Sequence, residues 1–307
     1  MTLRKTLSLL LVLFTSALLL PLQPAPAQGE DQPGSGFISY LFRRGEYQAA
    51  SLELHRFLYH RPDHPSTPYA RYLLALCRAN LGDLGKAEAE LRSLAGELEG
   101  VAEPAGLRGE VLVQTMNVQL RGGRFDDLLL LGEALDAEGV DLEPGLARYA
   151  DVLVLAALVY VNRWEHARGF VRSARGLDER VRARVDAEIR GLLAGRDKST
   201  LAAGLLSVVP GLGHLYAGRL SDGVRSLAVN AAFTGLWAAA FLHGAAPLAV
   251  LFGVAEAFLF AASLYGGINA VLQENASRVL DARDRILRLL PVPPLDVITL
   301  REEPAGL

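Results

Sequence analysis

The residues with the most chemical potential lie in a long apolar stretch near the C-terminus. Between Leu201 and Leu272 the formal charges are Arg219, Asp222, Arg225 and Glu256, and Glu256 alone stands inside a segment long enough to cross a bilayer. An ionised carboxylate at that depth costs about 2.5–3.5 kcal/mol on insertion scales. Such a group either responds to a proton or cation, contacts another subunit, or forms a hydrogen bond between helices of its own chain.

Four polar residues of the same stretch are candidate partners of the Glu256 carboxyl. They are Asn230, Asn269, Tyr265 and His214. A proton- or cation-responsive site would favour a transport function, whereas a satisfied hydrogen bond between helices would be structural. A lone acid does not decide between these two interpretations.

Elsewhere the chain offers little catalytic chemistry. His55, His60 and His64 cluster with Asp63, but Pro62 and Pro65 break any helix there, and a fourth ligand is not evident. No HExxH, GxSxG, P-loop or strand-borne GxGxxG motif occurs. Cys77 is the one cysteine, in the apolar run YLLALC, so we expect it to be buried. We predict no metal, no cofactor and no enzymatic activity.

The N-terminus has the pattern of a secretory signal. Arg4 and Lys5 precede an apolar run over residues 6–20, and the small-x-small sequence Ala25-Pro26-Ala27 follows. We predict a signal peptide over 1–27 and a polar linker over 28–36. An uncleaved anchor would also export the domain that follows.

Helical periodicity without strand-like alternation fills residues 37–195. Four positions in it share a glycine or asparagine, a large apolar residue two positions later and a small or apolar residue after three more. They are Gly45-x-Tyr47-x-x-Ala50, Gly82-x-Leu84-x-x-Ala87, Gly123-x-Phe125-x-x-Leu128 and Asn162-x-Trp164-x-x-Ala167, at steps of 37, 41 and 39 residues. Glycine or asparagine at the end of a helix provides a left-handed turn, the large residue packs back, and alanine lets two helices approach. The pattern predicts stacked helix pairs.

This pattern resembles the tetratricopeptide repeat family. The first two units, LFRRGEYQAASLELHRFLYHRPDHP and ARYLLALCRANLGDLGKAEAEL, match best, and the later two have drifted. The spacing exceeds the family period of about 34 residues. Residues 177–194 look like a solvent-facing capping helix after the last repeat. The resemblance implies a surface that binds a protein or peptide, for which Tyr40, Tyr47, Tyr69 and Tyr72 are candidates, although Tyr47 fits the core better.

Residues 199–273 form the predicted membrane domain. The segments 227–244 and 248–272 are long enough to span. The segment 201–218 contains proline and glycines, so it either spans or forms a kinked re-entrant or interfacial element. A third span would place the arginines after the membrane region inside the cytoplasm, as the positive-inside tendency favours. We therefore prefer three spans, followed by a basic helix and an extended tail over 274–307.

The sequence PGLGHLYAGR fills residues 210–219. Its distinctive members are Pro210, Gly211, Gly213, Tyr216, Gly218 and Arg219. It resembles the glycine- and tyrosine-rich signature of the bacterial two-transmembrane domain, in the form found in uncharacterised envelope proteins with tetratricopeptide repeats. The glycines allow a broken helix that another helix can approach closely, and the tyrosine and arginine suit the headgroup level. The motif is either an anchor without a ligand or a site for a lipid headgroup or partner helix.

Together these features predict an all-α protein, a helical-repeat solenoid followed by a small helical transmembrane domain. With a net charge of -3 and no basic stripe, we expect no nucleic-acid partner. The expected function is a multi-pass scaffold of the bacterial inner membrane, facing the periplasm and acting in envelope biogenesis or organisation. Its expected partners are a protein or peptide on the repeats, membrane lipid and a second membrane protein. The alternative is a small transport or lipid-handling module that uses Glu256 and the glycine-rich break, with the repeats as regulator.

Overall fold

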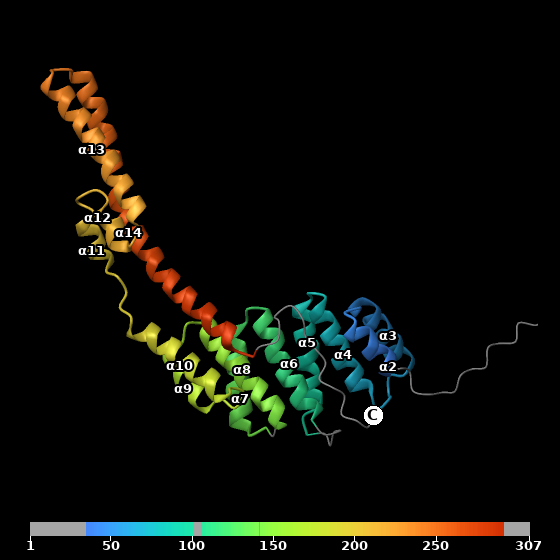
Figure 1. Cartoon of the computed structure of the whole chain (residues 1–307). Helices are drawn as coiled ribbons and strands as arrows, with labels where there is room; N and C mark the ends of the chain where they lie inside the picture. The colour runs from blue at the N-terminus through green and yellow to red at the C-terminus, as the bar shows by residue number, and fades with distance from the viewer. Residues whose placement is uncertain (1–34, 101–105, 141, 292–307) are drawn as a thin grey trace, which may run out of the picture.

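The structure is a computed structural model that describes residues 35–100, 106–140 and 142–291. These residues form thirteen helices and no strand, which confirms the all-α prediction (Figure 1). The predicted signal peptide over 1–27 lies outside the described residues, as does most of the predicted linker.

Helices α2 to α9 form four helix pairs that lie side by side along the chain order (Figure 1). The two helices of each pair pack on each other, and neighbouring pairs join through α3 and α4, α5 and α6, and α7 and α8. Their bounds are Ser35–Arg43 (α2), Tyr47–His60 (α3), Thr67–Asn80 (α4), Leu84–Glu97 (α5), Leu107–Arg121 (α6), Phe125–Glu138 (α7), Pro144–Tyr160 (α8) and Trp164–Ser173 (α9).

The turn within each pair falls where the shared sequence pattern places it. Gly45, Gly82, Gly123 and Asn162 have φ values of 75°, 90°, 70° and 58°. Asn162 is the one non-glycine residue with positive φ in the described part of the chain, and asparagine tolerates this conformation better than most side chains. The predicted left-handed turns are therefore confirmed in all four pairs.

The remaining positions of the pattern build the contacts between helices. Tyr47 packs edge-on against Phe42 with ring centroids 5.1 Å apart, and Phe125 stacks on Tyr160 at 4.6 Å. The small or apolar position is fully buried in every unit. The residues at that position are Ala50, Ala87, Leu128 and Ala167. The close packing predicted for them is confirmed.

One buried carboxylate joins the second and third pairs. Glu88 on α5 is 3% exposed and accepts hydrogen bonds from Gln119 Nε2 on α6 at 2.9 Å and from Arg124 at 2.5 Å. Arg92 lies 2.9 Å away on its own helix. Because the carboxylate has three donors, from α5, from α6 and from the turn before α7, its burial is compensated.

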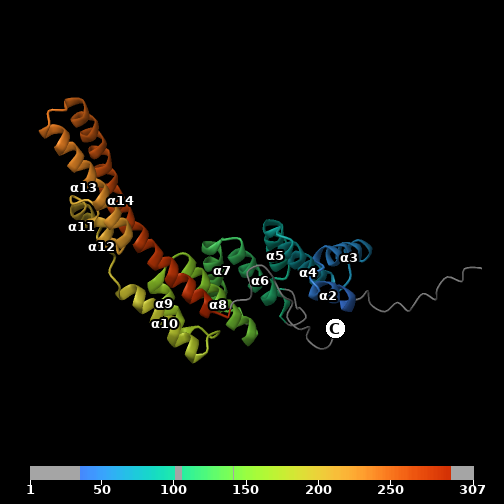
Figure 2. The ribbon, with the colours of Figure 1, turned by 45° about the horizontal axis from the view of Figure 1, so that its top comes forward.

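The last five helices carry the chain from the repeats to an apolar hairpin. They are α10 (Glu179–Ala194), α11 (Thr200–Leu206), α12 (Leu212–Ala217), α13 (Leu220–Leu242) and α14 (Ala246–Leu289). With 44 residues, α14 is roughly 66 Å long at 1.5 Å per residue. It passes residue 273, the predicted end of the membrane domain, without a break, and returns to the repeats (Figure 2).

The end of α14 belongs to the repeat core. Ile286 is fully buried and Leu290 nearly so, in the same apolar cluster that begins at Ile38. Helix α10, predicted as the solvent-facing cap, buries Val185 and Ile189 and packs on both α9 and α14. It is therefore not the last layer, because α14 covers it.

Candidate membrane module and partner-binding surfaces

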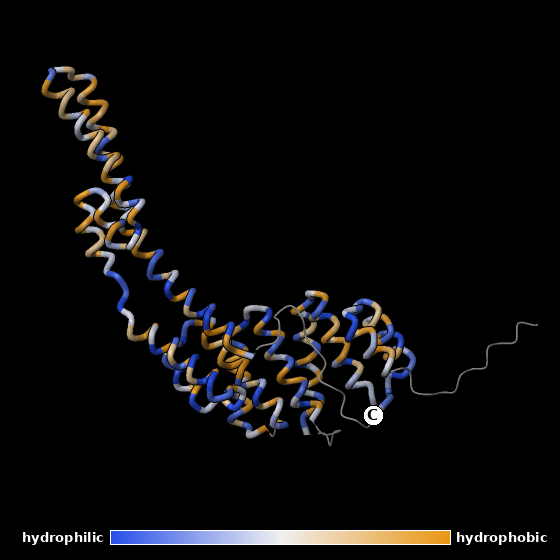
Figure 3. Tube along the Cα trace, in the orientation of Figure 1, coloured by the Kyte–Doolittle hydropathy of each residue, from blue (hydrophilic) through white to orange (hydrophobic). Residues whose placement is uncertain are grey.

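In the described part of the chain, α13 and α14 are the two helices long and apolar enough to cross a membrane. They pack against each other as a hairpin that projects away from the repeats (Figures 1 and 3). Most of their apolar side chains face outward. In the most apolar 18-residue stretch of each helix, 11% of the residues of α13 and 6% of those of α14 are buried. Strongly exposed members are Leu236, Trp237, Phe241, Leu242, Leu248, Val250, Leu251, Val254 and Phe258. This surface is suited to a hydrocarbon environment.

The segment 201–218 takes the broken form of the two predicted alternatives. It consists of α11, with seven residues, and α12, with six, separated by a turn. Each is roughly 10 Å long, whereas a span must cover about 30 Å. The preferred third span is therefore not formed, because α11 ends at Leu206 and a turn through Pro210 and Gly211 separates it from α12.

The glycines of the motif let α12 touch both long helices. Gly211 has φ +92°, and a Cβ there would lie 2.2 Å from the carbonyl oxygen of Gly223 on α13. A Cβ on Gly213 would lie 1.9 Å from Ser207 Oγ and 3.0 Å from the Gly267 Cα on α14. The predicted close approach is confirmed, and no larger residue fits these two positions without displacement.

The polar members of the motif bond within the chain. Tyr216 Oη accepts a hydrogen bond from the backbone N–H of Ser199 at 3.1 Å, and Arg219 Nη2 donates to Gln273 Oε1 at 2.6 Å. Gly218, with φ +93°, ends α12. The sequence indicated contacts with headgroups. In the structure, Tyr216 fastens α12 to residues 195–199, the linker between α10 and α11, and Arg219, directly before α13, bonds to α14.

A second set of polar side chains lies between α13 and α14. Ser226 and Ser263 hydroxyls are 2.7 Å apart, and Ser263 Oγ accepts from the N–H of Gly211 at 3.2 Å. Asn230, 4% exposed, donates to the carbonyl of Ser226 at 2.8 Å, while its Oδ1 has no hydrogen-bond partner. These contacts connect the motif to the hairpin.

Glu256 lines a shallow groove on the hairpin with Trp237 and Thr234. Its Oε2 is covered and has no hydrogen-bond partner. None of the four predicted partners bonds to it: Asn230 bonds to Ser226, Tyr265 is largely exposed, Asn269 is half-buried elsewhere on α14, and His214 packs on Gly266. The structure therefore does not contain the hydrogen bond that one interpretation of Glu256 required between helices of the same chain.

The basic part of α14 docks on the linker before the membrane module. Arg278 donates to the carbonyl oxygens of Arg196 at 2.7 Å and Gly195 at 3.0 Å. Asn275 exchanges two hydrogen bonds of 3.0 Å with the backbone of Lys198. The linker is thus held along α14 by backbone contacts.

Further along, the same helix docks on the repeats. Arg285 Nε donates to Glu188 Oε2 on α10 at 2.9 Å, and the Arg283 guanidinium lies 5.7 Å from the ring centroid of Tyr160. Sequence reasoning missed these contacts because the apolar stretch ends at Leu272, which suggested that the membrane helix ends there too. The signal that could have found them is the lack of any glycine or proline between residue 268 and Pro291.

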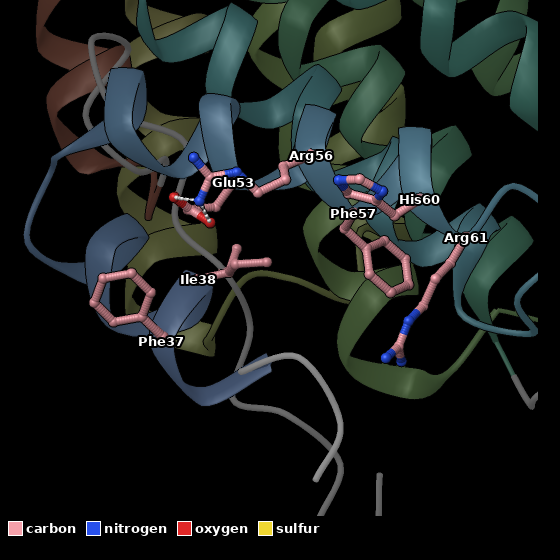
Figure 4. A pocket seen from close by; sticks show the side chains of 7 residues that line it. All are labelled: Phe37, Ile38, Glu53, Arg56, Phe57, His60 and Arg61. Carbon is pink, nitrogen blue, oxygen red and sulfur yellow. Dashed lines mark hydrogen bonds and ion pairs between the residues drawn. The ribbon is translucent and has the colours of Figure 1, made fainter. Parts of the chain in front are cut away.

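A groove of about 510 Å³ lies at the N-terminal end of the repeats (Figure 4). Its apolar part comes from Phe37 and Ile38 on α2 and from Phe57 on α3. Glu53 and Arg56 form an ion pair of 3.1 Å at its edge. Also lining it are His60 and Arg61.

One positive charge at this groove is left without an ion pair by the described residues, the Arg61 guanidinium. The His60 ring lies edge-on to the ring of Tyr59, with centroids 5.2 Å apart. An apolar floor beside an unpaired guanidinium is suited to an acidic segment with apolar side chains. Of the tyrosines considered from sequence, Tyr40 is exposed beside this groove and Tyr72 is buried.

The neighbouring histidines are engaged locally. His55 Nδ1 lies 2.7 Å from the carbonyl of Ser51, and His64 Nδ1 accepts from the N–H of Ser66 at 3.1 Å. The described residues contain no group of three or more His, Cys, Asp or Glu side chains that could hold a metal ion.

No protein-family model, curated protein or solved structure matches this chain. The resemblances to tetratricopeptide repeats and to the two-transmembrane domain thus stay predictions that rest on their motifs.

Proposed function

We propose that this chain is a membrane-anchored scaffold that binds a protein or peptide partner through its helical repeats. The observation that carries the proposal is that α14 is one unbroken helix. Its apolar first part forms the hairpin with α13, and its last part buries Ile286 in the repeat core. A soluble repeat domain would need no such helix. The arrangement holds a binding surface at a fixed distance from a bilayer.

The end groove between α2 and α3 supports a binding role. Exposed aromatic rings and an uncompensated guanidinium, as at Phe37 and Arg61, are typical of surfaces that recognise peptide segments. Stacked helix pairs offer extended surfaces of this kind. We place the partner in the bacterial envelope, with the repeats in the periplasm and the hairpin in the inner membrane.

The fold constrains the orientation of the proposed scaffold. A hairpin enters and leaves a bilayer on the same side, and α14 returns to α10 after it. The repeats and residues 274–291 then share one side. With the repeats exported by the predicted signal peptide, the arginines of α14 lie outside the cytoplasm as well, against the positive-inside tendency.

In-cell photocrosslinking tests the scaffold function. A photoreactive phenylalanine analogue at Phe37, which lines the groove, is compared with the same probe at Leu130, exposed on α7. We expect one dominant protein adduct at position 37, reduced by Arg61→Glu and retained with Arg148→Glu as the matched charge reversal. Adducts to lipid or to the chain itself alone, at both positions, would refute the proposal.

A second candidate function has one observation in its favour. The uncompensated carboxyl of Glu256 in an apolar hairpin fits a small transport or lipid-handling module, with the repeats as regulator. Loss of the cellular phenotype on Glu256→Gln, with normal amounts of folded protein, supports this candidate. A phenotype unchanged by Glu256→Gln and abolished by Arg61→Glu supports the scaffold.

A further inference from the structure

Three polar side chains gather on one face of the hairpin without hydrogen bonds. Glu256 on α14 and Thr234 and Trp237 on α13 line the same groove. Within the described residues none of these side chains forms a hydrogen bond, and Glu256 Oε2 is covered without a partner. One carboxyl acceptor and two donors, a hydroxyl and an indole N–H, thus stand together unused.

Their depth makes this costly in a membrane. Glu256 follows the start of α14 at Ala246 by ten residues, so it lies about 15 Å from the tip of the hairpin. That is the middle of a hydrocarbon core of about 30 Å. Because no water is available at that depth, unpaired polar groups are satisfied by protein.

The surface around Glu256 allows another helix to come close. Ala257 on α14 is exposed and lines the groove, and small side chains let transmembrane helices touch. A Cβ on Gly253 would lie 3.1 Å from the Trp237 ring, so the indole forms the wall of the groove. Trp237 itself is 43% exposed.

We propose that this groove binds the same hairpin of a second copy of the chain. A two-fold axis brings Glu256 Oε1, the carboxyl oxygen that its own chain does not cover, to the Trp237 indole N–H or the Thr234 hydroxyl of the other copy. The pairing is self-complementary, because one groove contains both the acceptor and the donors. A partner that supplied only donors or only acceptors would leave part of the groove unsatisfied.

Disulfide crosslinking of the full chain in lipid vesicles tests this pairing. In a Cys77→Ala background, Ala257→Cys places a thiol beside the groove, and Phe258→Cys places one on the adjoining outward face. On dilution with lipid, we expect the Ala257→Cys dimer to persist and the Phe258→Cys dimer to fall to the level of random collision.

The role of Glu256 is tested in the Ala257→Cys background. Glu256→Leu, which removes the acceptor, should lower the dimer association constant about three- to tenfold, as hydrogen bonds between transmembrane helices allow. Glu256→Gln, which keeps an amide acceptor, should stay within about twofold. Leucine favours membrane insertion, so the loss is not one of anchoring.

Several outcomes overturn the proposal. Equal crosslinking at positions 257 and 258 would show collision without a specific interface. A chain that is monomeric at every dilution would exclude a second copy as the partner. A Glu256→Leu variant that associates like its parent would show that the carboxyl does not hold the two copies together. An equal loss with Gln and Leu would show that the acceptor is not what matters.

Discussion

The docking of α14 on the repeats gives the sharpest test of the proposal that this helix connects the membrane hairpin to the repeat domain. Ile286 is fully buried in the repeat core, whereas the nearby ion pair between Arg285 and Glu188 is half exposed. An exposed ion pair contributes about 0–1 kcal/mol, and a buried Ile→Ala change costs about 2–5 kcal/mol. The apolar contact therefore dominates, and Ile286→Ala is the informative perturbation.

The expected loss lies in the lower half of that range. Ile286 is within the last turn of α14, where the helix end can move to refill part of the cavity. A cost of about 2–3 kcal/mol lowers the ratio of docked to undocked α14 by roughly 30- to 140-fold. We expect α10 and the end of α14 to become more open by that factor, because each covers the other.

Hydrogen exchange of the full chain in lipid nanodiscs measures this effect. Peptides from α10 and from the end of α14 should exchange faster in Ile286→Ala, and peptides from α4 and α5 should not change. Leu280→Ala, at a half-exposed position of the same helix, is the control and should stay within about twofold of the parent chain. Unchanged exchange in α10, or faster exchange spread evenly over all helices, would refute the local docking reasoning.

Three further predictions follow from the packing and electrostatics. Glu88→Ala should destabilise the repeats by about 2–3 kcal/mol, because it leaves buried Gln119 without its acceptor; chemical unfolding checks this, and a change below about 0.5 kcal/mol would contradict it. Gly211→Ala should separate α12 from the backbone of α13, which a Cβ would strike at 2.2 Å; faster proteolysis within residues 195–220 is the expected readout, and unchanged cleavage would count against the contact. The hydrogen bond from Arg71 lowers the pKa of Glu97 below its ordinary 4.5, so its contribution is complete above that pH and is lost as pH falls through the folded-state pKa. Unfolding curves between about pH 6 and pH 3 should show a small loss that Glu97→Gln abolishes, and parallel pH profiles for both chains would refute it.

The sequence was sufficient to predict the turns of the repeats. At each of the four positions a glycine or asparagine must adopt positive φ, and few other residues do so without strain. Asn162 shows that the pattern is physical, because it replaces glycine and keeps the same conformation at 58°. Local backbone chemistry fixes these turns, so one sequence is enough to find them.

The sequence was not sufficient to predict the length and docking of α14. Hydropathy falls after Leu272, so a search for apolar spans divides one helix into a membrane part and a basic part. Nothing in the backbone chemistry divides it, since residues from 269 to 290 contain no helix breaker. Its burial also depends on helices about a hundred residues earlier in the chain, such as α10, and a local pattern contains no information about such partners.

The arginines after the membrane region show how the same residues admit two explanations. Counted as charges, they favour a cytoplasmic location and a third span. In the structure they have nearby protein partners: Arg278 binds backbone carbonyl groups of the linker, Arg285 binds Glu188, and Arg283 covers the ring of Tyr160. A cation already held by protein contacts within a folded unit is a weak guide to orientation. The orientation of the repeats then depends on the predicted N-terminal signal, and the arginines of α14 follow the repeats to whichever side they occupy.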